Sequence, residues 1–174
     1  RNVDPLASTQ FTYSRFLVPK LMNYQGWAVF CDCDFIFLGD VSNLLNNLDE
    51  SKAVYCVQHD YTPKEKHKMD GQKQTIYPRK NWSSFMIFNK NKCNLTFEEV
   101  FSLPLSALHQ FKWCNEEDIG EIPLEWNWLV GDYEPREDAK GYHYTLGGPW
   151  YGDQQYESPM NKIWLDMESE YESI

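Results

Sequence analysis

Two carboxylates stand one residue apart, Asp32 and Asp34, at the end of an apolar run that begins at Trp27. Side chains alternate along a strand, so we expect both aspartates to point to the same face, with their Cα atoms roughly 7 Å apart. Carboxylate oxygens suit a hard divalent ion such as Mg²⁺ or Mn²⁺, whose open positions can take phosphate oxygens of a substrate. The alternative is that one aspartate caps the next turn and the other is solvated.

A further candidate ligand is His143, in the segment 143–150. Imidazole binds Mn²⁺ and similar ions, and the pair Gly147 and Gly148 would let backbone amides approach a pyrophosphate closely. The same residues also suit a packed histidine followed by an ordinary Gly-Gly-Pro turn. Combined with the acidic pair, His143 leads to the hypothesis of one three-residue metal site.

Strands and helices alternate along the chain, which predicts an α/β layer fold in a single domain over residues 1–174. Residues with high strand propensity predict strands at 27–32, 53–59, 83–89 and 142–145. Caps, prolines and apolar spacing predict helices from Ser8 to Gly26, from Ser42 to Leu48, after Thr96 with Glu99 in a capping box, from Pro104 to Phe111, and after Ser158. The polar residues 61–80, punctuated by proline and glycine, indicate a long surface loop.

The composition limits the classes of function. Hydrophobic residues make up 42% of the 174 residues, which is enough for one domain with a core. The chain has 26 acidic and 16 basic residues and a net charge of -10. This balance argues against a nucleic-acid partner, because binding a phosphate backbone by counterion release needs a basic surplus. No apolar run approaches the roughly 18 residues of a transmembrane helix.

The five cysteines are odd in number, and two of them, Cys31 and Cys33, flank Asp32. This usage favours reduced thiols and a cytoplasmic location over a disulfide framework. A zinc site at this pair would need a second pair at ligand spacing, which the sequence lacks.

Five segments carry a resemblance to a known class of enzymes: 14–17, 27–38, 82–89, 124–128 and 143–150. Their order resembles that in the GT-A nucleotide-sugar glycosyltransferases. The chain is most similar to family 8, the glycogenin and bacterial galactosyltransferase type, and to related small bacterial or phage-like glycosyltransferases. The resemblance covers nearly the whole chain and implies a Rossmann-like mixed central sheet flanked by helices. It also implies transfer of a hexosyl group from a UDP-sugar to a hydroxyl acceptor, such as a glycan.

The resemblance assigns roles to individual residues. It implies a Mn²⁺ or Mg²⁺ ion held by Asp32, Asp34 and His143. It places further residues at the nucleotide-sugar: Arg15 near the donor phosphate or sugar, Gly147 and Gly148 against the diphosphate, and Cys33 and Trp150 within the two binding segments. Glu116 and Glu117 fall where such enzymes have a carboxylate beside the transferred sugar. The alternative for these two glutamates is a solvated helix start.

Three departures from the family pattern affect these expectations. Gly148 stands in place of the usual lysine, so Lys73, Lys80 or Arg79 would have to supply a cation for the β-phosphate. Trp82 stands in place of a common asparagine, which leaves the sugar specificity open. The family also begins with a strand and helix that hold the uridine, whereas this chain starts at the helix before the metal strand.

From that last departure we expect residues 1–174 to be the C-terminal part of a longer domain. These residues alone would lack the first nucleotide-binding strand. The unpaired sheet edge would favour self-association into a homo-oligomer. Two other functions stay open: a metal-dependent nucleotidyltransferase, which normally has a basic, glycine-rich early loop, and a non-catalytic module that binds a glycan or nucleotide.

Overall fold

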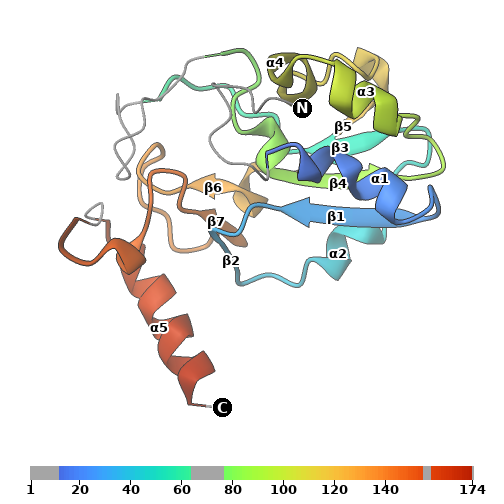
Figure 1. The fold of residues 1–174 in the computed structure, drawn as a ribbon. Coiled ribbons are helices and arrows are strands. Elements are labelled where there is room, and N and C mark those ends of the chain that lie inside the picture. Colours follow the sequence, from blue (N-terminus) through green and yellow to red (C-terminus); the bar gives the residue numbers. More distant parts are fainter. Residues whose placement is uncertain (1–11, 64–76, 155–157, 174) are drawn as a thin grey trace. The chain divides into compact units, whose positions relative to one another are not determined.

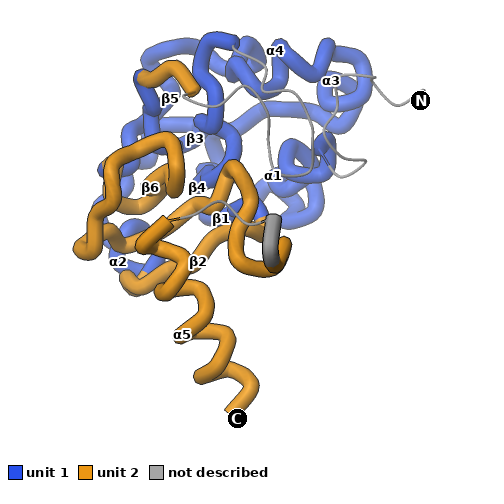
Figure 2. The backbone as a smooth tube through the Cα atoms, turned by 90° about the vertical axis from the view of Figure 1, so that its left-hand side faces the viewer, with its two compact units in different colours: residues 1–32, 41–60, 77–123 blue, residues 33–40, 61–76, 124–174 orange. Residues whose placement is uncertain are grey.

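The computed structural model describes residues 12–63, 77–154 and 158–173 (Figure 1). The chain divides into two compact units. Unit 1 comprises residues 1–32, 41–60 and 77–123, and unit 2 comprises residues 33–40, 61–76 and 124–174 (Figure 2). The described part contains no helix that is long and apolar enough to cross a membrane.

Unit 1 is built on a four-stranded mixed sheet with the order β1-β4-β3-β5. Its strands are β1 (Trp27–Cys31), β3 (Val54–Cys56), β4 (Phe85–Asn89) and β5 (Ile119–Glu121). Strand β4 is antiparallel to both β1 and β3, whereas β3 and β5 are parallel. All five residues of β4 are buried, which explains why its sequence is an apolar run without alternation.

Short helices accompany this sheet. They are η1 (Ser14–Leu17), α1 (Val18–Leu21), α2 (Ser42–Leu45), η2 (Trp82–Ser84), α3 (Phe97–Ser102), α4 (Leu105–His109) and η3 (Glu116–Asp118). The predicted capping box opens α3: the Glu99 amide donates to Thr96 Oγ1 at 3.2 Å, and the Thr96 amide donates to Glu99 Oε2 at 2.8 Å. Pro104 is the N-cap residue of α4, as its place in the sequence predicts.

Unit 2 is built on a three-stranded sheet with the order β2-β7-β6. Its strands are β2 (Phe35–Phe37), β6 (Trp128–Leu129) and β7 (Gly141–His143), and its helices are η4 (Leu124–Trp126), η5 (Pro149–Gln154) and α5 (Asn161–Glu172). Strand β7 lies between antiparallel β2 and parallel β6. Tyr142 and Tyr144 are fully buried in the core of this unit, beside Met160.

Several predicted boundaries are wrong by a few residues. Helix α1 begins at Val18, with Pro19 in its first turn, where proline is tolerated rather than disruptive. The strand predicted from Ser83 begins at Phe85, because Trp82–Ser84 form a 3₁₀ turn. The helix predicted to reach Leu48 ends at Leu45. Ser8 and most of the predicted loop 61–80 lie outside the described residues. The mixed, helix-flanked arrangement agrees with the α/β prediction, with its strands divided over two sheets.

Candidate functional site

Asp32 and Asp34 lie in the link between β1 and β2. Strand β1 ends at Cys31, and the Asp32 amide donates to the Ser84 carbonyl at 2.8 Å. The chain then passes from unit 1 to unit 2 and joins the second sheet at Phe35. The two aspartates therefore do not lie on one face of a single strand. The prediction that strand alternation would bring them together is wrong. Alternation holds only while the backbone stays in one ladder.

His143 is held on three sides within unit 2. It pairs with Phe35 in the β2–β7 register, and the two rings stack with centroids 4.3 Å apart. Its Nδ1 lies 3.0 Å from Asn127 Oδ1, and its Nε2 lies 3.4 Å from Asp34 Oδ1. The Asp34 carbonyl in turn accepts from the Tyr144 amide at 2.9 Å. The pairing of β2 with β7 thus sets the backbone positions of Asp34 and His143.

This arrangement fits a cation between Asp34 and His143. In the neutral tautomer in which Nδ1 donates to the Asn127 oxygen, Nε2 presents a lone pair. That lone pair lies opposite a carboxylate oxygen, so two acceptors stand next to each other with His143 almost completely buried. A metal ion satisfies both acceptors, and an amide oxygen on Nδ1 is the kind of partner that orients a metal-binding histidine.

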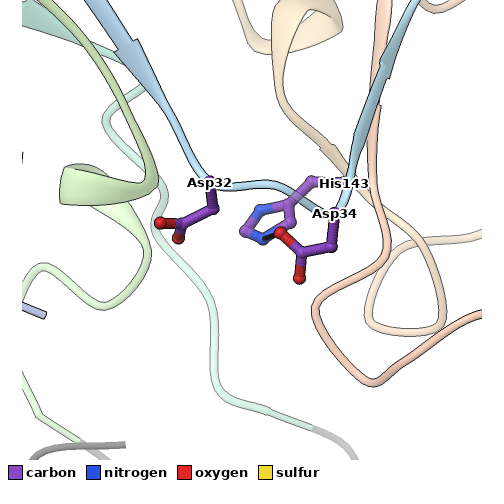
Figure 3. Close-up of side chains that lie close together, drawn as sticks. All are labelled: Asp32, Asp34 and His143. Atoms are coloured by element: carbon purple, nitrogen blue, oxygen red, sulfur yellow. Dashed lines mark ion pairs between the residues drawn. The ribbon is translucent and has the colours of Figure 1, made fainter. Parts of the chain in front are cut away.

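Asp32 completes the candidate ligand set. One ligand atom from each of Asp32, Asp34 and His143 lies within 4.8 Å of the others (Figure 3). The convergence of these three side chains is as the sequence predicts. Two carboxylate oxygens and one imidazole nitrogen form a donor set that suits Mn²⁺ or Mg²⁺. Occupation of the site by either ion stays a prediction.

Arg15 pairs with Asp32, and its predicted role at the donor phosphate or sugar stays a prediction. Its Nη2 lies 2.8 Å from Asp32 Oδ1, and its Nη1 lies 3.3 Å from Asp32 Oδ2. Nη1 also donates to the Ser83 carbonyl at 2.9 Å, and Nε donates to the Thr12 carbonyl at 3.2 Å. In this structure the guanidinium is engaged with acceptors of unit 1.

A neighbouring pair was not predicted from the sequence. Ser83 Oγ lies 2.5 Å from His109 Nδ1. Burial, followed by the charges of Arg15 and Lys80, lowers the pKa of His109 to about 3. The imidazole is therefore neutral at physiological pH. Ser83 and His109 are 26 residues apart, and neither stands in a motif that indicates the contact.

The three alternative cations for the diphosphate differ in position. Lys73 lies outside the described residues. Arg79 pairs with Glu116 and donates from Nη1 to the Gln110 carbonyl at 2.8 Å. Lys80 is buried, with its Nζ 5.4 Å from the centroid of the Tyr77 ring.

The acidic segment in η3 is at the surface. Glu116 is exposed and pairs with Arg79. Glu117 is also exposed, and its carbonyl accepts from Lys52 Nζ at 2.6 Å. Asp118 Oδ2 accepts from Asn115 Nδ2 at 3.0 Å, so this carboxylate stabilises the local turn. A catalytic role for Glu116 or Glu117 stays a prediction.

The structure explains why glycine stands at both positions after β7, Gly147 and Gly148. Gly147 has φ +111°, in a region that favours glycine. A Cβ atom on Gly148 would lie 2.3 Å from Cζ3 of Trp150, so the indole packs directly on this glycine. Trp150 is 43% exposed and lies 4.4 Å, centroid to centroid, from Trp164. Cys33, between Asp32 and Asp34, is exposed. None of these contacts tests the predicted binding roles.

No family model matches the chain, but one curated relative identifies its family. Over 180 aligned positions it is 47% identical to Protein CDI of Arabidopsis thaliana, and the alignment covers 98% of this chain and 69% of that protein. The chain belongs to the family of Protein CDI.

Three solved structures have the same fold. GlyE, a glycosyltransferase of Streptococcus pneumoniae TIGR4, matches 92% of this chain with a TM-score of 0.56 and 14% identity. An active-site mutant of LgtC matches 91% with a TM-score of 0.55 and 12% identity. The bifunctional glycosyltransferase WbbM in its apo form matches 91% with a TM-score of 0.52 and 16% identity.

These structural matches cover only part of each neighbour. The chain spans 37% of the WbbM chain, 44% of the GlyE chain and 66% of the LgtC chain. At this level of identity the likeness shows the fold: mixed sheets flanked by helices, in the manner of the GT-A glycosyltransferases. The predicted fold class is confirmed.

Proposed function

We propose that this chain belongs to a metal-dependent glycosyltransferase that moves a hexosyl group from a UDP-sugar to a hydroxyl acceptor. One observation carries the proposal: one ligand atom from each of Asp32, Asp34 and His143 lies within 4.8 Å of the others, with His143 Nε2 3.4 Å from Asp34 Oδ1. A fold shared with glycosyltransferases supports it. The nucleotidyltransferase alternative has no comparable observation in its favour.

In this proposal Asp32, Asp34 and His143 hold a Mn²⁺ or Mg²⁺ ion. When bound, such an ion supplies Lewis-acid stabilisation of the nucleoside diphosphate that leaves. Asn127 keeps His143 in the tautomer that directs a lone pair to the site. Gly147, without a side chain, allows the donor diphosphate to approach the backbone.

Lys80 is our choice for the cation that the family places at the position of Gly148. Lys80 is buried close enough to His109 to help depress the pKa of that imidazole, as Arg15 also does. Lys80 and Arg15 therefore both act on the His109 ring, and Arg15 pairs with Asp32. Arg79 is the weaker candidate, because its guanidinium is engaged with Glu116 and a carbonyl.

Glu117 is our choice for the carboxylate beside the transferred sugar. Of the two glutamates proposed from the sequence, Glu116 already neutralises Arg79. Glu117 has an exposed side chain, and the contact with Lys52 uses its backbone carbonyl.

The test is release of UDP from a panel of UDP-hexoses, followed with Mn²⁺, with Mg²⁺ and with chelator. We expect release that depends on the metal and is abolished by Asp34→Ala. Asp138→Ala is the matched control, since Asp138 is an exposed aspartate of the same unit and pairs with Arg136. Release that persists in chelator or in Asp34→Ala contradicts the proposal. Mn²⁺-dependent UDP binding without release from any donor indicates the non-catalytic module instead.

A further inference from the structure

We infer that Arg15 is a positioning residue that orients the Asp32 carboxylate toward the metal site, and that it is not a ligand of the donor phosphate. The inference rests on the proposed function, because it concerns the same metal site. It reverses the role that the family resemblance implies for Arg15. The starting point is the two-point contact of the guanidinium with both oxygens of Asp32, at 2.8 and 3.3 Å.

The guanidinium is fixed independently of Asp32. Its Nη1 donates to the Ser83 carbonyl and its Nε donates to the Thr12 carbonyl. Its carbon lies 5.1 Å from the centroid of the Phe30 ring. The Arg15 side chain is 13% exposed. All three nitrogens are therefore directed at protein acceptors, and moving the group to a phosphate would leave buried carbonyls unsatisfied.

The acceptors of Arg15 are themselves held in place. Ser83 is 3% exposed, and its hydroxyl contacts His109, whose ring packs edge-on against Phe16 at 5.4 Å between centroids. The Asp32 amide donates to the carbonyl of Ser84, which follows Ser83 in the same turn. The turn at residues 83–84 thus fixes Asp32 twice: directly through its backbone, and through Arg15 by its carboxylate.

Arg15 contacts Asp32, a proposed metal ligand, in the way expected of a residue that orients a ligand without binding the metal. A planar fork that grips both carboxylate oxygens sets the orientation of the carboxylate plane. A carboxylate oxygen has two lone-pair directions, so contact with Arg15 leaves one for a metal ion. Removing such a partner typically lowers metal affinity by roughly 10- to 100-fold.

The charge of Arg15 acts in the opposite sense. A positive group this close to the site repels a divalent cation, so loss of the charge alone would tighten metal binding. Arg15→Lys separates the two effects, because lysine keeps the charge but lacks the planar fork. If orientation is the role of Arg15, the lysine variant loses affinity for the metal although its charge is unchanged.

The experiment measures the dissociation constant for Mn²⁺ alone, without nucleotide, by titration calorimetry and by electron paramagnetic resonance of the free ion. We expect Arg15→Lys to raise this constant roughly 10- to 100-fold. Arg136→Lys is the matched control: Arg136 also pairs with an aspartate, Asp138, and lies 4.9 Å from the centroid of the Trp128 ring. This control should bind Mn²⁺ like the wild type.

A double-mutant cycle shows whether Arg15 acts through Asp32. In the Asp32→Asn background, Arg15→Lys should cause little further loss of Mn²⁺ affinity, because the carboxylate it orients is gone. A loss of equal size in both backgrounds overturns the inference and indicates general damage. Melting temperatures of all four proteins give the corresponding structural readout.

A nucleotide titration distinguishes the two roles of Arg15. At Mn²⁺ concentrations that saturate each protein, Arg15→Lys should bind UDP as the wild type does. Unchanged Mn²⁺ affinity combined with weakened UDP binding overturns the inference and restores Arg15 to the donor phosphate, while the proposed function stands. Failure of the wild type itself to bind Mn²⁺ is a different result, which defeats the proposed function and this inference together.

Discussion

His109 should make the folded protein sensitive to acid. Its pKa is about 3 in the folded chain, against a reference of 6.5, because burial disfavours the charged ring and the charges of Arg15 and Lys80 add to this. Between these two values the unfolded chain binds one more proton than the folded chain. The free energy of unfolding therefore falls as the pH falls through this window, and it does not depend on His109 above it.

The size of the effect follows from the shift. At about 1.36 kcal/mol per unit, the whole displacement of the His109 pKa corresponds to about 5 kcal/mol. Between about pH 7 and pH 4.5 the titration of His109 lowers the free energy of unfolding by about 2.5 kcal/mol. For a domain with a typical stability of about 5 to 15 kcal/mol, that is a large fraction.

The measurement is urea unfolding at a series of pH values for the wild type and for His109→Gln. Glutamine has an amide oxygen that can accept from Ser83 Oγ, but it does not titrate. Contributions of carboxylates are common to both proteins and cancel in the difference. We expect the wild type to lose about 2.5 kcal/mol more than the variant between about pH 7 and pH 4.5. Equal losses in the two proteins would refute the burial of a neutral imidazole at this position.

Three further predictions concern local features. Gly120→Ala should lower the free energy of unfolding by about 1 to 3 kcal/mol, because its Cβ would lie 2.3 Å from Tyr55 Cε1, and unchanged stability would disprove the packing argument. Thr96→Ala should cost about 1 kcal/mol in the same assay, with Thr96→Ser close to the wild type; no loss would show that the capping box is not stabilising. Asp34→Ala should abolish the Mn²⁺-induced rise in melting temperature but leave the metal-free melting temperature little changed; a rise of wild-type size would remove Asp34 from the site.

Features that depend on neighbouring residues could be predicted from the sequence. The capping box joins Thr96 to Glu99, three positions further along the chain, and the structure has both of its hydrogen bonds. The apolar run from Phe85 predicts a buried strand for a similar reason, since its pattern records burial on both faces. Local rules suffice where the interaction partners are near in sequence.

The site could be predicted only in part. Asp32, Asp34 and His143 converge as expected, yet the two aspartates lie in a link between two sheets and not on one strand. The partner of Arg15 could not be inferred, because the pair spans 17 residues and depends on how the η1 turn packs against the end of β1. The neutral state of His109 likewise arises from tertiary burial, which a single sequence does not reveal.

The distribution of cysteines gives this chain a ready position for a reporter group. Burial raises the pKa of the Cys56 thiol, and it raises those of Cys93 and Cys114 to about 11 and about 12. These thiols carry almost no thiolate at neutral pH and should react slowly with alkylating reagents. Cys31 and Cys33 are exposed and stand on either side of Asp32. Brief labelling with a maleimide dye should therefore mark the acidic link first, where paramagnetic Mn²⁺ would quench the fluorescence on binding and metal uptake could be followed without any knowledge of the sugar donor.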